Sequence, residues 1–313
     1  MPLLVNVCLA RAGRKVEARN RVPDVLKAIV FMVAKIDRLA DIKGQYDVVL
    51  CDVWGVLHNG VESFQPAAEA LRNFRIEGGT VVLITNSPRL SADVGLQIVG
   101  LGVGADSYDA IVTSGDVTRA LIEDGPKNIH FVGADWNQSL LDGLDVSCVG
   151  IEEADAVVCA GLRDDENEQA EDYLPMLEQA KARDLPFVCA NPDIVVERGH
   201  KLVPCAGAIA ALYEKMGGVT RISGKPHRPI YEAALETAKT VKGAVDPRRV
   251  VAIGDGMPTD IKGAHDFGLD VIYIALGIHA AIYSRTGVID EAALDTFLAE
   301  HRMTPVGWMP RLR

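Results

Sequence analysis

Four apolar segments of this chain each run directly into polar side chains that could act on a phosphoryl group. The first segment ends in Asp52, a carboxylate that can serve as a nucleophile, and Gly55 lets the backbone turn sharply beside it. The second segment ends in Thr85 and Asn86, which can hold phosphate oxygens. The third ends in Lys225, which can neutralise charge, and the fourth ends in Asp255 and Asp260, which can bind a metal. Two anions about 4 Å apart repel each other by about 4 kcal/mol even at an effective dielectric constant of about 20, so a cation must screen them. The pattern therefore predicts phosphoryl chemistry in which Mg²⁺ and Lys225 supply that screening.

Short runs rich in Val and Ile alternate with segments of helical period, which is the pattern of βα units around a mostly parallel sheet. We expect strands over residues 47–52, 80–85, 110–114, 129–133, 156–160, 186–190, 250–254 and 271–276. We expect helices over residues 66–77, 89–99, 115–123, 167–183, 206–216, 229–241, 259–267 and 290–300. Pro66 and Pro229 suit the first turn of a helix, and Ser114 and Thr259 suit N-caps. Because α/β folds bind ligands at the carboxyl ends of parallel strands, the polar segments should meet at one edge of the sheet.

The run from about residue 127 to 207 has strands and helices of its own, yet it lies between segments that look like parts of one catalytic fold. We therefore expect an N-terminal extension over 1–44, a discontinuous core over 45–126 and 208–313, and an inserted cap domain over 127–207. Residues 1 to about 31 could lie outside the fold, with Met32 as an alternative start. Their Arg-rich, acid-poor character would also suit an organelle transit peptide, whereas apolar residues before basic ones reverse the order of a secretory signal.

Composition limits the class of protein. The 313 residues are 49% hydrophobic and carry a formal net charge of -11, which opposes nonspecific attraction to nucleic acid. No apolar run approaches the roughly 18 residues of a membrane-spanning helix. The six cysteines show no C-x-x-C spacing, and several lie inside apolar runs, which is typical of buried reduced thiols in a cytoplasmic protein.

In order and spacing, the four segments resemble the motifs of the haloacid dehalogenase (HAD) superfamily of aspartate-nucleophile phosphatases. The place of the insertion resembles class IIA, the NagD-like group, and Asn191-Pro192-Asp193 stands where that group has its cap motif. The resemblance spans roughly residues 45 to 280. It implies an α/β fold with a Rossmann-like parallel-sheet core and an inserted α/β cap of the C2 type. It also implies Mg²⁺ as cofactor and a homodimer formed through the cap.

The same resemblance assigns roles residue by residue. Asp52 resembles the nucleophile that becomes an aspartyl phosphate, and Lys225 resembles the cation that neutralises both nucleophile and phosphate. Thr85 and Asn86 resemble the phosphate-holding pair. By the same resemblance Mg²⁺ would be bound by Asp52, the backbone carbonyl of Trp54, Asp255 and Asp260.

Trp54 departs from the family pattern and gives the first motif a DxWGV form. Family phosphatases have an aspartate at this position, which protonates the leaving oxygen and then activates water, and an indole can do neither. Since general acid-base catalysis contributes about 10²–10⁴-fold, we expect a slow phosphatase. Three residues could replace the missing acid: His58, which is six residues after Asp52 and is the first choice for that reason, His227, and Asp193. For either histidine, a purely structural role is the alternative.

The leading hypothesis is a Mg²⁺-dependent phosphatase of small phosphorylated metabolites, of the sugar phosphate or nitrophenyl phosphate type. A catalytically silent protein that binds or responds to a phosphorylated ligand is the alternative, because Trp54 removes the acid. A dinucleotide enzyme is disfavoured because no G-x-G-x-x-G follows the strand at 250–254. The sequence does not identify the substrate, and the plausible cap contacts are Arg163, Asn191, Asp193 and Arg198.

Overall fold

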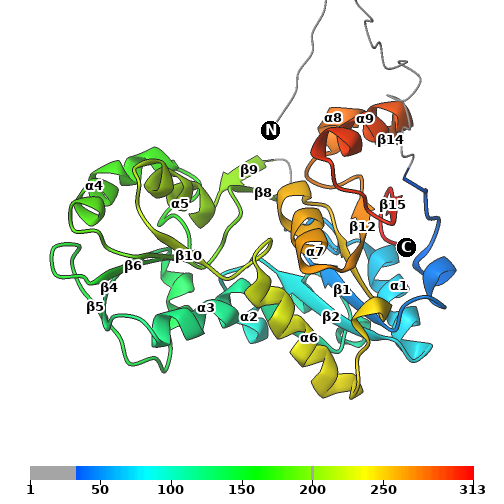
Figure 1. Ribbon diagram of the computed structural model, residues 1–313, viewed down its shortest axis with the longest axis horizontal. Coiled ribbons are helices and arrows are strands. Elements are labelled where there is room, and N and C mark those ends of the chain that lie inside the picture. Colours follow the sequence, from blue (N-terminus) through cyan, green and yellow to red (C-terminus); the bar gives the residue numbers. More distant parts are fainter. Residues whose placement is uncertain (1–32, 199–200) are drawn as a thin grey trace, which may run out of the picture. The chain divides into compact units, whose positions relative to one another are not determined.

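The computed structural model describes residues 33–198 and 201–313 (Figure 1), so the expectations for residues 1–31 lie outside the described residues. A six-stranded sheet forms the centre of the core, with the strand order β15-β12-β11-β1-β2-β3. Its strands are β1 (Val48–Asp52), β2 (Thr80–Thr85), β3 (Ala110–Thr113), β11 (Val250–Gly254), β12 (Asp270–Ile274) and β15 (Gly307–Met309). Every neighbouring pair is parallel, as the alternation of strands and helices predicts.

Both faces of this sheet are covered, which explains why its strands are apolar without interruption. All five residues of β1 are buried, and successive side chains point to opposite faces. Val49 and Cys51 pack on one face, against helix α1 (Gln65–Ile76). Val48 and Leu50 pack on the other face, against α6 (Arg228–Lys242), α7 (Lys262–Phe267) and α9 (Glu291–His301). The sheet therefore holds the end of β1, and with it Asp52, in a rigid position.

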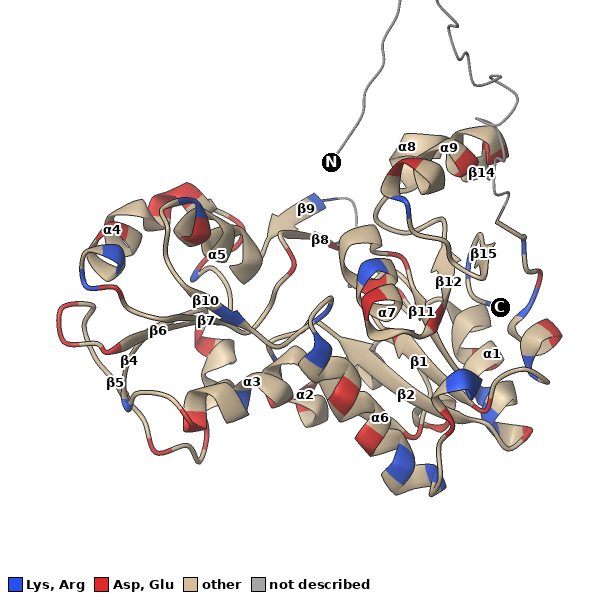
Figure 2. Ribbon diagram, viewed as in Figure 1, with Lys and Arg blue, Asp and Glu red and all other residues tan. Residues whose placement is uncertain are grey.

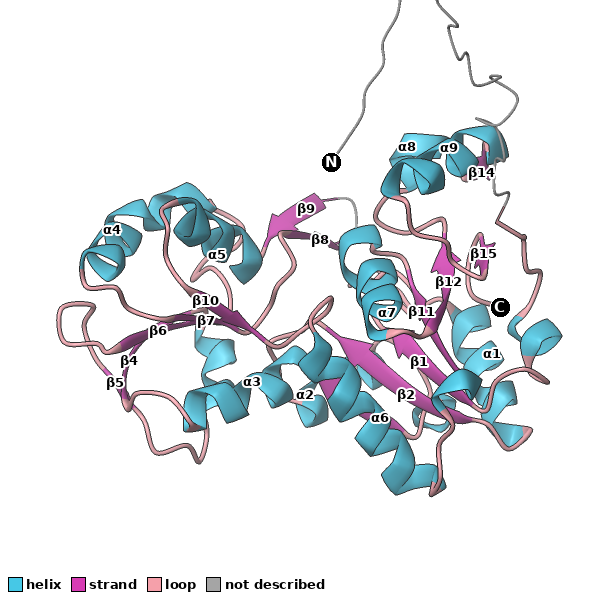
Figure 3. Cartoon of the chain, in the orientation of Figure 1, coloured by secondary structure: helices cyan, strands magenta, loops and turns pink. Residues whose placement is uncertain are grey.

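A second parallel sheet, with the order β10-β7-β6-β4-β5, forms the inserted unit (Figure 3). Its strands are β4 (Asn128–Val132), β5 (Ser147–Cys148), β6 (Ala156–Cys159), β7 (Phe187–Cys189) and β10 (Thr220–Ile222). Helices α4 (Leu174–Ala182) and α5 (Ala206–Lys215) share a hydrophobic cluster with it. Because β10 pairs with β7, this unit continues beyond the boundary expected at residue 207.

The remaining elements connect or flank the two sheets. They are α2 (Ser91–Gly100), α3 (Ser114–Glu123), α8 (Ala280–Tyr283), the antiparallel pair β8 (Val195–Arg198) and β9 (Lys201–Pro204), and the antiparallel pair β13 (Ser284–Arg285) and β14 (Val288–Ile289). Short 3₁₀ helices cover Leu39–Ile42 (η2), Ala105–Ser107 (η3), Asp135–Leu141 (η4), Ala170–Tyr173 (η5) and Pro247–Arg249 (η6), and a π-helical turn covers Met257–Ile261 (η7). Helix α6 carries Lys and Arg as well as Glu side chains (Figure 2).

The helix-start signals are partly confirmed. Pro66 and Pro229 lie in the first turns of α1 and α6, as predicted. The assignment of Ser114 as an N-cap is wrong, because the neighbouring Thr113 caps α3 and accepts a hydrogen bond from the Asp116 N–H. Thr259 is not a cap either, since it lies inside the π-helical turn η7.

Residues 33–44 do not behave as an extension outside the fold, which corrects the expected boundary at residue 44. Leu39 and Ile42 are buried in the cluster on one face of the central sheet, and Lys35 pairs with Trp308 of β15. Five cysteines are described and all are free, and only Cys148 among them is exposed. None of the described helices has the length and apolar character that crossing a membrane requires.

Candidate active site

The carboxyl ends of β1, β2 and β11 meet in one cavity of about 300 Å³. Asp52 is the last residue of β1, Thr85 is the last residue of β2, and Asp255 directly follows β11. Lys225 comes from the loop between β10 and α6, and Asp260 comes from η7. The residues that the sequence singles out for catalysis and metal binding all line this cavity, namely Asp52, Trp54, Thr85, Asn86, Lys225, Asp255 and Asp260.

Lys225 forms the electrostatic centre of this cavity. Its Nζ lies 2.5 Å from Oδ1 of Asp52 and 2.7 Å from Oδ1 of Asp260, and all three side chains are buried. Burial alone would lower the pKa of Lys225, but the carboxylates of Asp260 and Asp52 raise it well above its ordinary value. The lysine is therefore an ammonium ion. Its positive charge offsets the negative charge of Asp52, which would otherwise repel a phosphate group.

The donor set fits a divalent cation. One carboxylate oxygen from each of Asp52, Asp255 and Asp260 lies within 4.8 Å of the others. Burial, together with the charge of Asp260, raises the pKa of Asp52 well above its usual range and that of Asp255 to about 7. Lys225 alone leaves these three acidic groups with excess negative charge, which a cation such as Mg²⁺, with its preference for oxygen ligands, would balance.

Two glycines leave room for that donor set. A Cβ on Gly55 would lie 2.2 Å from Oδ2 of Asp255, and a Cβ on Gly277 would lie 2.0 Å from the same oxygen. Gly55 also has a φ of +83°, which other residues adopt only at a cost. The Asp255 carboxylate is further fixed by the N–H of Ile278 at 2.8 Å. The residues present therefore fit a magnesium site.

Asn86 connects the core to the inserted unit. Its Oδ1 accepts a hydrogen bond from the Lys225 N–H at 2.7 Å, and its Nδ2 donates to the Lys225 carbonyl at 3.1 Å. The same Nδ2 donates to Oδ1 of Asp193 at 2.8 Å. Burial raises the pKa of Asp193 to about 6. The Asn191-Pro192-Asp193 loop thus brings a further carboxyl group, from the inserted unit, into the cavity that contains Asp52.

Trp54 is held between the core and the hairpin β8–β9. Its indole Nε1 donates a hydrogen bond to the backbone oxygen of Glu197 in β8. A Cβ on Gly60 would lie 2.5 Å from the indole ring, and the ring of His58 meets the indole edge-on at a centroid distance of 4.9 Å. The Trp54 side chain therefore closes one wall of the cavity by packing and by a hydrogen bond to the hairpin.

The three candidate surrogates for the missing acid lie in different places. His58 is buried, its Nδ1 accepts the N–H of Gly60 at 2.9 Å, and burial lowers its pKa to about 4, so it is a neutral ring with its proton on Nε2. It lines a second, neighbouring cavity and not the one that contains Asp52. His227 is exposed at the start of α6 and lines neither cavity. Asp193 lines both.

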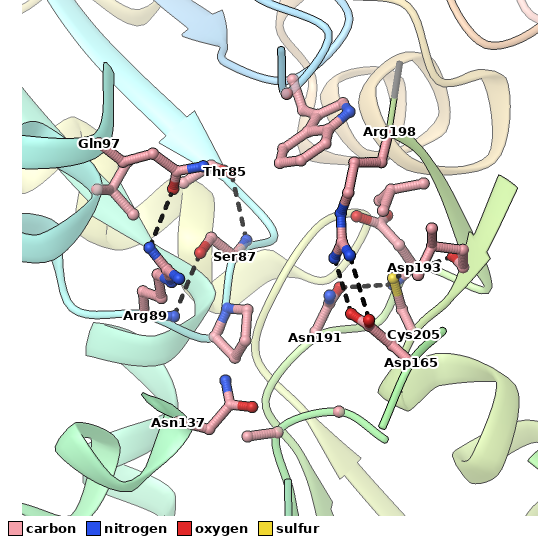
Figure 4. Close-up of a pocket in the computed structure, with 18 of the residues that line it drawn as sticks. Thr85, Ser87, Arg89, Gln97, Asn137, Asp165, Asn191, Asp193, Arg198 and Cys205 are labelled. Carbon is pink, nitrogen blue, oxygen red and sulfur yellow. Dashed lines mark hydrogen bonds and ion pairs between the residues drawn. The ribbon is translucent and has the colours of Figure 1, made fainter. Parts of the chain in front are cut away.

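The second cavity has a volume of about 340 Å³ and lies between the core and the inserted unit (Figure 4). Of the proposed cap contacts, Asn191 and Arg198 line it. Arg163 does not, because its guanidinium lies 5.4 Å from the ring of Tyr173 and its side chain is exposed. The structure therefore does not bring Arg163 to the site.

Sequence reasoning missed several residues that line the cavities, namely Arg89, Trp136, Asn137 and Asp165 in the second and Arg311 in the first. Arg89 follows the Thr85-Asn86-Ser87 segment closely enough that its place at the same sheet edge could have been predicted. The others come from a 3₁₀ helix, a loop and the C-terminal segment, whose positions depend on tertiary packing.

Known proteins with this fold identify the family. The model of the haloacid dehalogenase-like hydrolases matches residues 49–147, and a HAD-hydrolase-like model matches residues 222–301. A crystal structure of a haloacid dehalogenase-like family hydrolase from Brucella suis 1330 is 50% identical, covers 89% of this chain and 100% of its own, and has a TM-score of 0.81. The chain therefore belongs to the haloacid dehalogenase-like hydrolase family.

Two more distant matches agree with class IIA, the NagD-like group. NagD from Escherichia coli K-12 is 26% identical, with 85% of this chain and 97% of that chain covered and a TM-score of 0.63. The 5'-nucleotidase YutF of Bacillus subtilis strain 168 is 24% identical over 237 residues, which is 74% of this chain and 88% of the relative. The family and the α/β fold with an inserted cap, as predicted from the four motifs, are thus confirmed.

Proposed function

We propose that this protein is a Mg²⁺-dependent phosphatase of small phosphorylated metabolites that acts through an aspartyl phosphate on Asp52. As a member of the NagD-like group it is a phosphoric monoester hydrolase. The observation that carries the finer proposal is the contact of the Lys225 ammonium with Asp52 at 2.5 Å and with Asp260 at 2.7 Å, in one cavity with Asp255. This arrangement suits a phosphoryl group that must approach a carboxylate.

In the proposed reaction a carboxylate oxygen of Asp52 attacks phosphorus, and the bond from phosphorus to the ester oxygen breaks. Lys225 stays protonated and neutralises charge on Asp52 and on the phosphoryl oxygens. The Thr85 hydroxyl donates a hydrogen bond to those oxygens, and Asn86, whose two amide N–H groups bind the Lys225 carbonyl and Asp193, holds these two residues in place. Mg²⁺, bound by Asp52, Asp255, Asp260 and the Trp54 carbonyl, would supply further positive charge at the phosphoryl group.

We propose Asp193 as the group that protonates the leaving oxygen. It lines the cavity that contains Asp52 and Lys225, whereas His58 lines the neighbouring cavity and His227 lines neither. Its pKa of about 6, raised by burial, leaves a larger protonated fraction near neutral pH than an ordinary carboxyl group has. Asp193 belongs to the cap, so its position at the leaving oxygen depends on how the cap lies on the core. An acid at position 54 would lie on the core itself, two residues after Asp52. We therefore expect slow turnover of substrates with poor leaving groups.

The proposal includes the domain organisation. We propose a core of residues 33–126 together with the segment after β10, because Leu39 and Ile42 pack in it. We propose a cap that runs from about residue 127 through β10, because β10 and α5 pack with the second sheet. We also propose that the protein acts in the cytoplasm and forms a homodimer through the cap.

The test is hydrolysis of p-nitrophenyl phosphate in the presence of Mg²⁺, with Asp52→Asn as the control. We expect release of nitrophenolate that requires Mg²⁺ and is lost in Asp52→Asn. Hydrolysis that is unchanged by this substitution would refute Asp52 as the nucleophile.

A phosphate-ligand binding protein without turnover is the second candidate. Trp54 favours it, because the side chain at the position of the acid is engaged with the backbone of Glu197. Tight binding of a phosphorylated metabolite, with no product after long incubation at high protein concentration, would support this candidate over the phosphatase.

A further inference from the structure

The second cavity adjoins the reaction site directly. The side chains of Trp54, Thr85 and Asp193 line both cavities, so the second cavity lies beside the place where a phosphate at Asp52 would be bound. The other walls of this cavity are formed mainly by residues outside the four motifs that are proposed to act on the phosphate. Its chemistry therefore bears on the leaving group of the substrate.

Arg89 brings an uncompensated positive charge to this cavity. Its guanidinium lies 4.5 Å from the ring of Trp136. One of its nitrogens lies 3.4 Å from Oε1 of Gln97 (Figure 4). Among the residues that the structure describes, no carboxylate forms an ion pair with it. The other arginine in the cavity differs, because Arg198 forms a two-bond ion pair with Asp165 at 3.1 and 2.7 Å.

Asn137 brings a hydrogen-bond donor that has no partner. Its side chain is 1% exposed, and its Nδ2 is a buried nitrogen without a hydrogen bond in the described part of the chain. The orientation of the amide is fixed, since Oδ1 accepts the N–H of Ala134 at 3.1 Å. A buried donor left without an acceptor is destabilising, so a ligand oxygen at this position would be favourable.

Arg89 and Asn137 lie on the same side of the second cavity (Figure 4), and Arg89 stacks on Trp136, the residue that precedes Asn137 in η4. A guanidinium and an amide donor on one wall together suit an oxygen-bearing anion. The opposite wall contributes the Arg198–Asp165 pair, whose charges cancel.

We propose that the second cavity binds the leaving group of the substrate, and that Arg89 and Asn137 bind a second anionic group on it. The inference rests on the proposed phosphatase function. It names the substrate class as small phosphomonoesters that carry an additional carboxylate or phosphate group.

The experiment is isothermal titration calorimetry with Mg²⁺ present, in the Asp52→Asn background so that no ligand is consumed. Glycerol 3-phosphate is compared with 3-phosphoglycerate, which adds a carboxylate, and fructose 6-phosphate is compared with fructose 1,6-bisphosphate, which adds a phosphate. We expect the doubly anionic member of at least one pair to bind about tenfold or more tightly. The pair that shows the preference identifies the second anion.

Arg89→Gln should reduce this preference to about threefold or less, because it removes the charge and keeps a side chain of similar reach. Asn137→Asp, which keeps the acceptor for Ala134 and removes the donor, should reduce it as well. Arg228→Ala is the matched control, since Arg228 also stacks on an aromatic ring, that of Phe267 at 4.6 Å, but lines neither cavity. It should keep the preference of the parent protein.

Equal binding within both pairs, no binding of any of these ligands, or a preference that persists in Arg89→Gln would overturn the inference. Failure of the phosphatase proposal is recognised separately, as the absence of Asp52-dependent hydrolysis of p-nitrophenyl phosphate. The binding ratios do not depend on that result.

Discussion

The indole N–H of Trp54 donates a hydrogen bond to the backbone oxygen of Glu197, which joins the loop after the nucleophile strand directly to strand β8. The side chain at the position where family phosphatases have an acid therefore serves as a contact to the β8–β9 hairpin. One substitution thus explains both the lost proton donor and the closed wall of the cavity.

Restoring the acid should speed the reaction. We expect Trp54→Asp to raise kcat on alkyl phosphates by about 10²-fold, because general acid-base catalysis contributes about 10²–10⁴-fold. Steady-state kinetics over a panel of phosphorylated metabolites would measure this. Trp54→Phe is the control, since it removes the N–H donor to Glu197 without adding an acid, and it should give no such rise. An equal gain in both variants would mean that release of the hairpin, and not proton transfer, limits the rate.

The pH dependence should reveal Asp193 as the proton donor. Its protonated fraction falls as pH rises through about 6, so the rate on alkyl phosphates should fall over the same range. p-Nitrophenyl phosphate should show a weaker decline, because nitrophenolate leaves with little protonation. In Asp193→Asn the alkyl phosphate rate should be low and lack this decline. A profile that is identical in wild type and Asp193→Asn would eliminate Asp193 from proton transfer.

A methyl group at Gly55 should damage the magnesium site. In Gly55→Ala the Cβ would lie 2.2 Å from Oδ2 of Asp255, so we expect Mg²⁺ affinity to fall by at least about tenfold. Gly78→Ala is the matched control, because Gly78 has a φ of +85° with no atom within 4 Å of the added Cβ, and its strain is that of the backbone alone. Metal titration followed by calorimetry compares the two variants. Equal loss of Mg²⁺ binding in both would attribute the effect to backbone strain.

Lys225 should also be a stability residue. Lys225→Met leaves the buried Asp52 and Asp260 without their cation, which we expect to cost about 3–5 kcal/mol in the free energy of unfolding near neutral pH. Mg²⁺ should recover part of this loss. Lys262→Met removes an exposed ion pair with Asp266 and should cost no more than about 1 kcal/mol. Urea unfolding with and without Mg²⁺ measures both variants, and similar costs for the two lysines would argue against a buried charge cluster.

The sequence predicts the strands of the central sheet well because each is a short apolar run, buried on both faces, that ends in a turn or a polar group. The expected strands at 80–85 and 250–254 coincide with β2 and β11. The strands that were not predicted are β5, β8, β9, β10, β13, β14 and β15. Only one residue of β9 is buried, and three-residue β15 is specified by its pairing with β12 more than by its own pattern.

The candidate site likewise contains some residues that the sequence predicts and others that it does not. Asp52 and Asp255 were predicted to lie together because both follow apolar strands, and parallel strands bring their carboxyl ends to one edge. The roles of Trp136 and Asn137 could not be predicted, because they lie in a 3₁₀ helix whose position depends on the packing of the second sheet. The choice of His58 shows that closeness in sequence does not guarantee a place in the same cavity. His58 lies six residues from Asp52 but lines the neighbouring cavity.

In the proposed reaction Asp52 carries the phosphoryl group during turnover. Acid quenching of the protein mixed with p-nitrophenyl phosphate and Mg²⁺, followed by mass spectrometry, tests it directly. Because water activation is also weakened by Trp54, we predict that phosphoenzyme accumulates, that the added phosphoryl group maps to Asp52, and that Asp52→Asn gains none. Turnover without any phosphorylated protein, or a phosphoryl group mapped to another residue, would contradict the account.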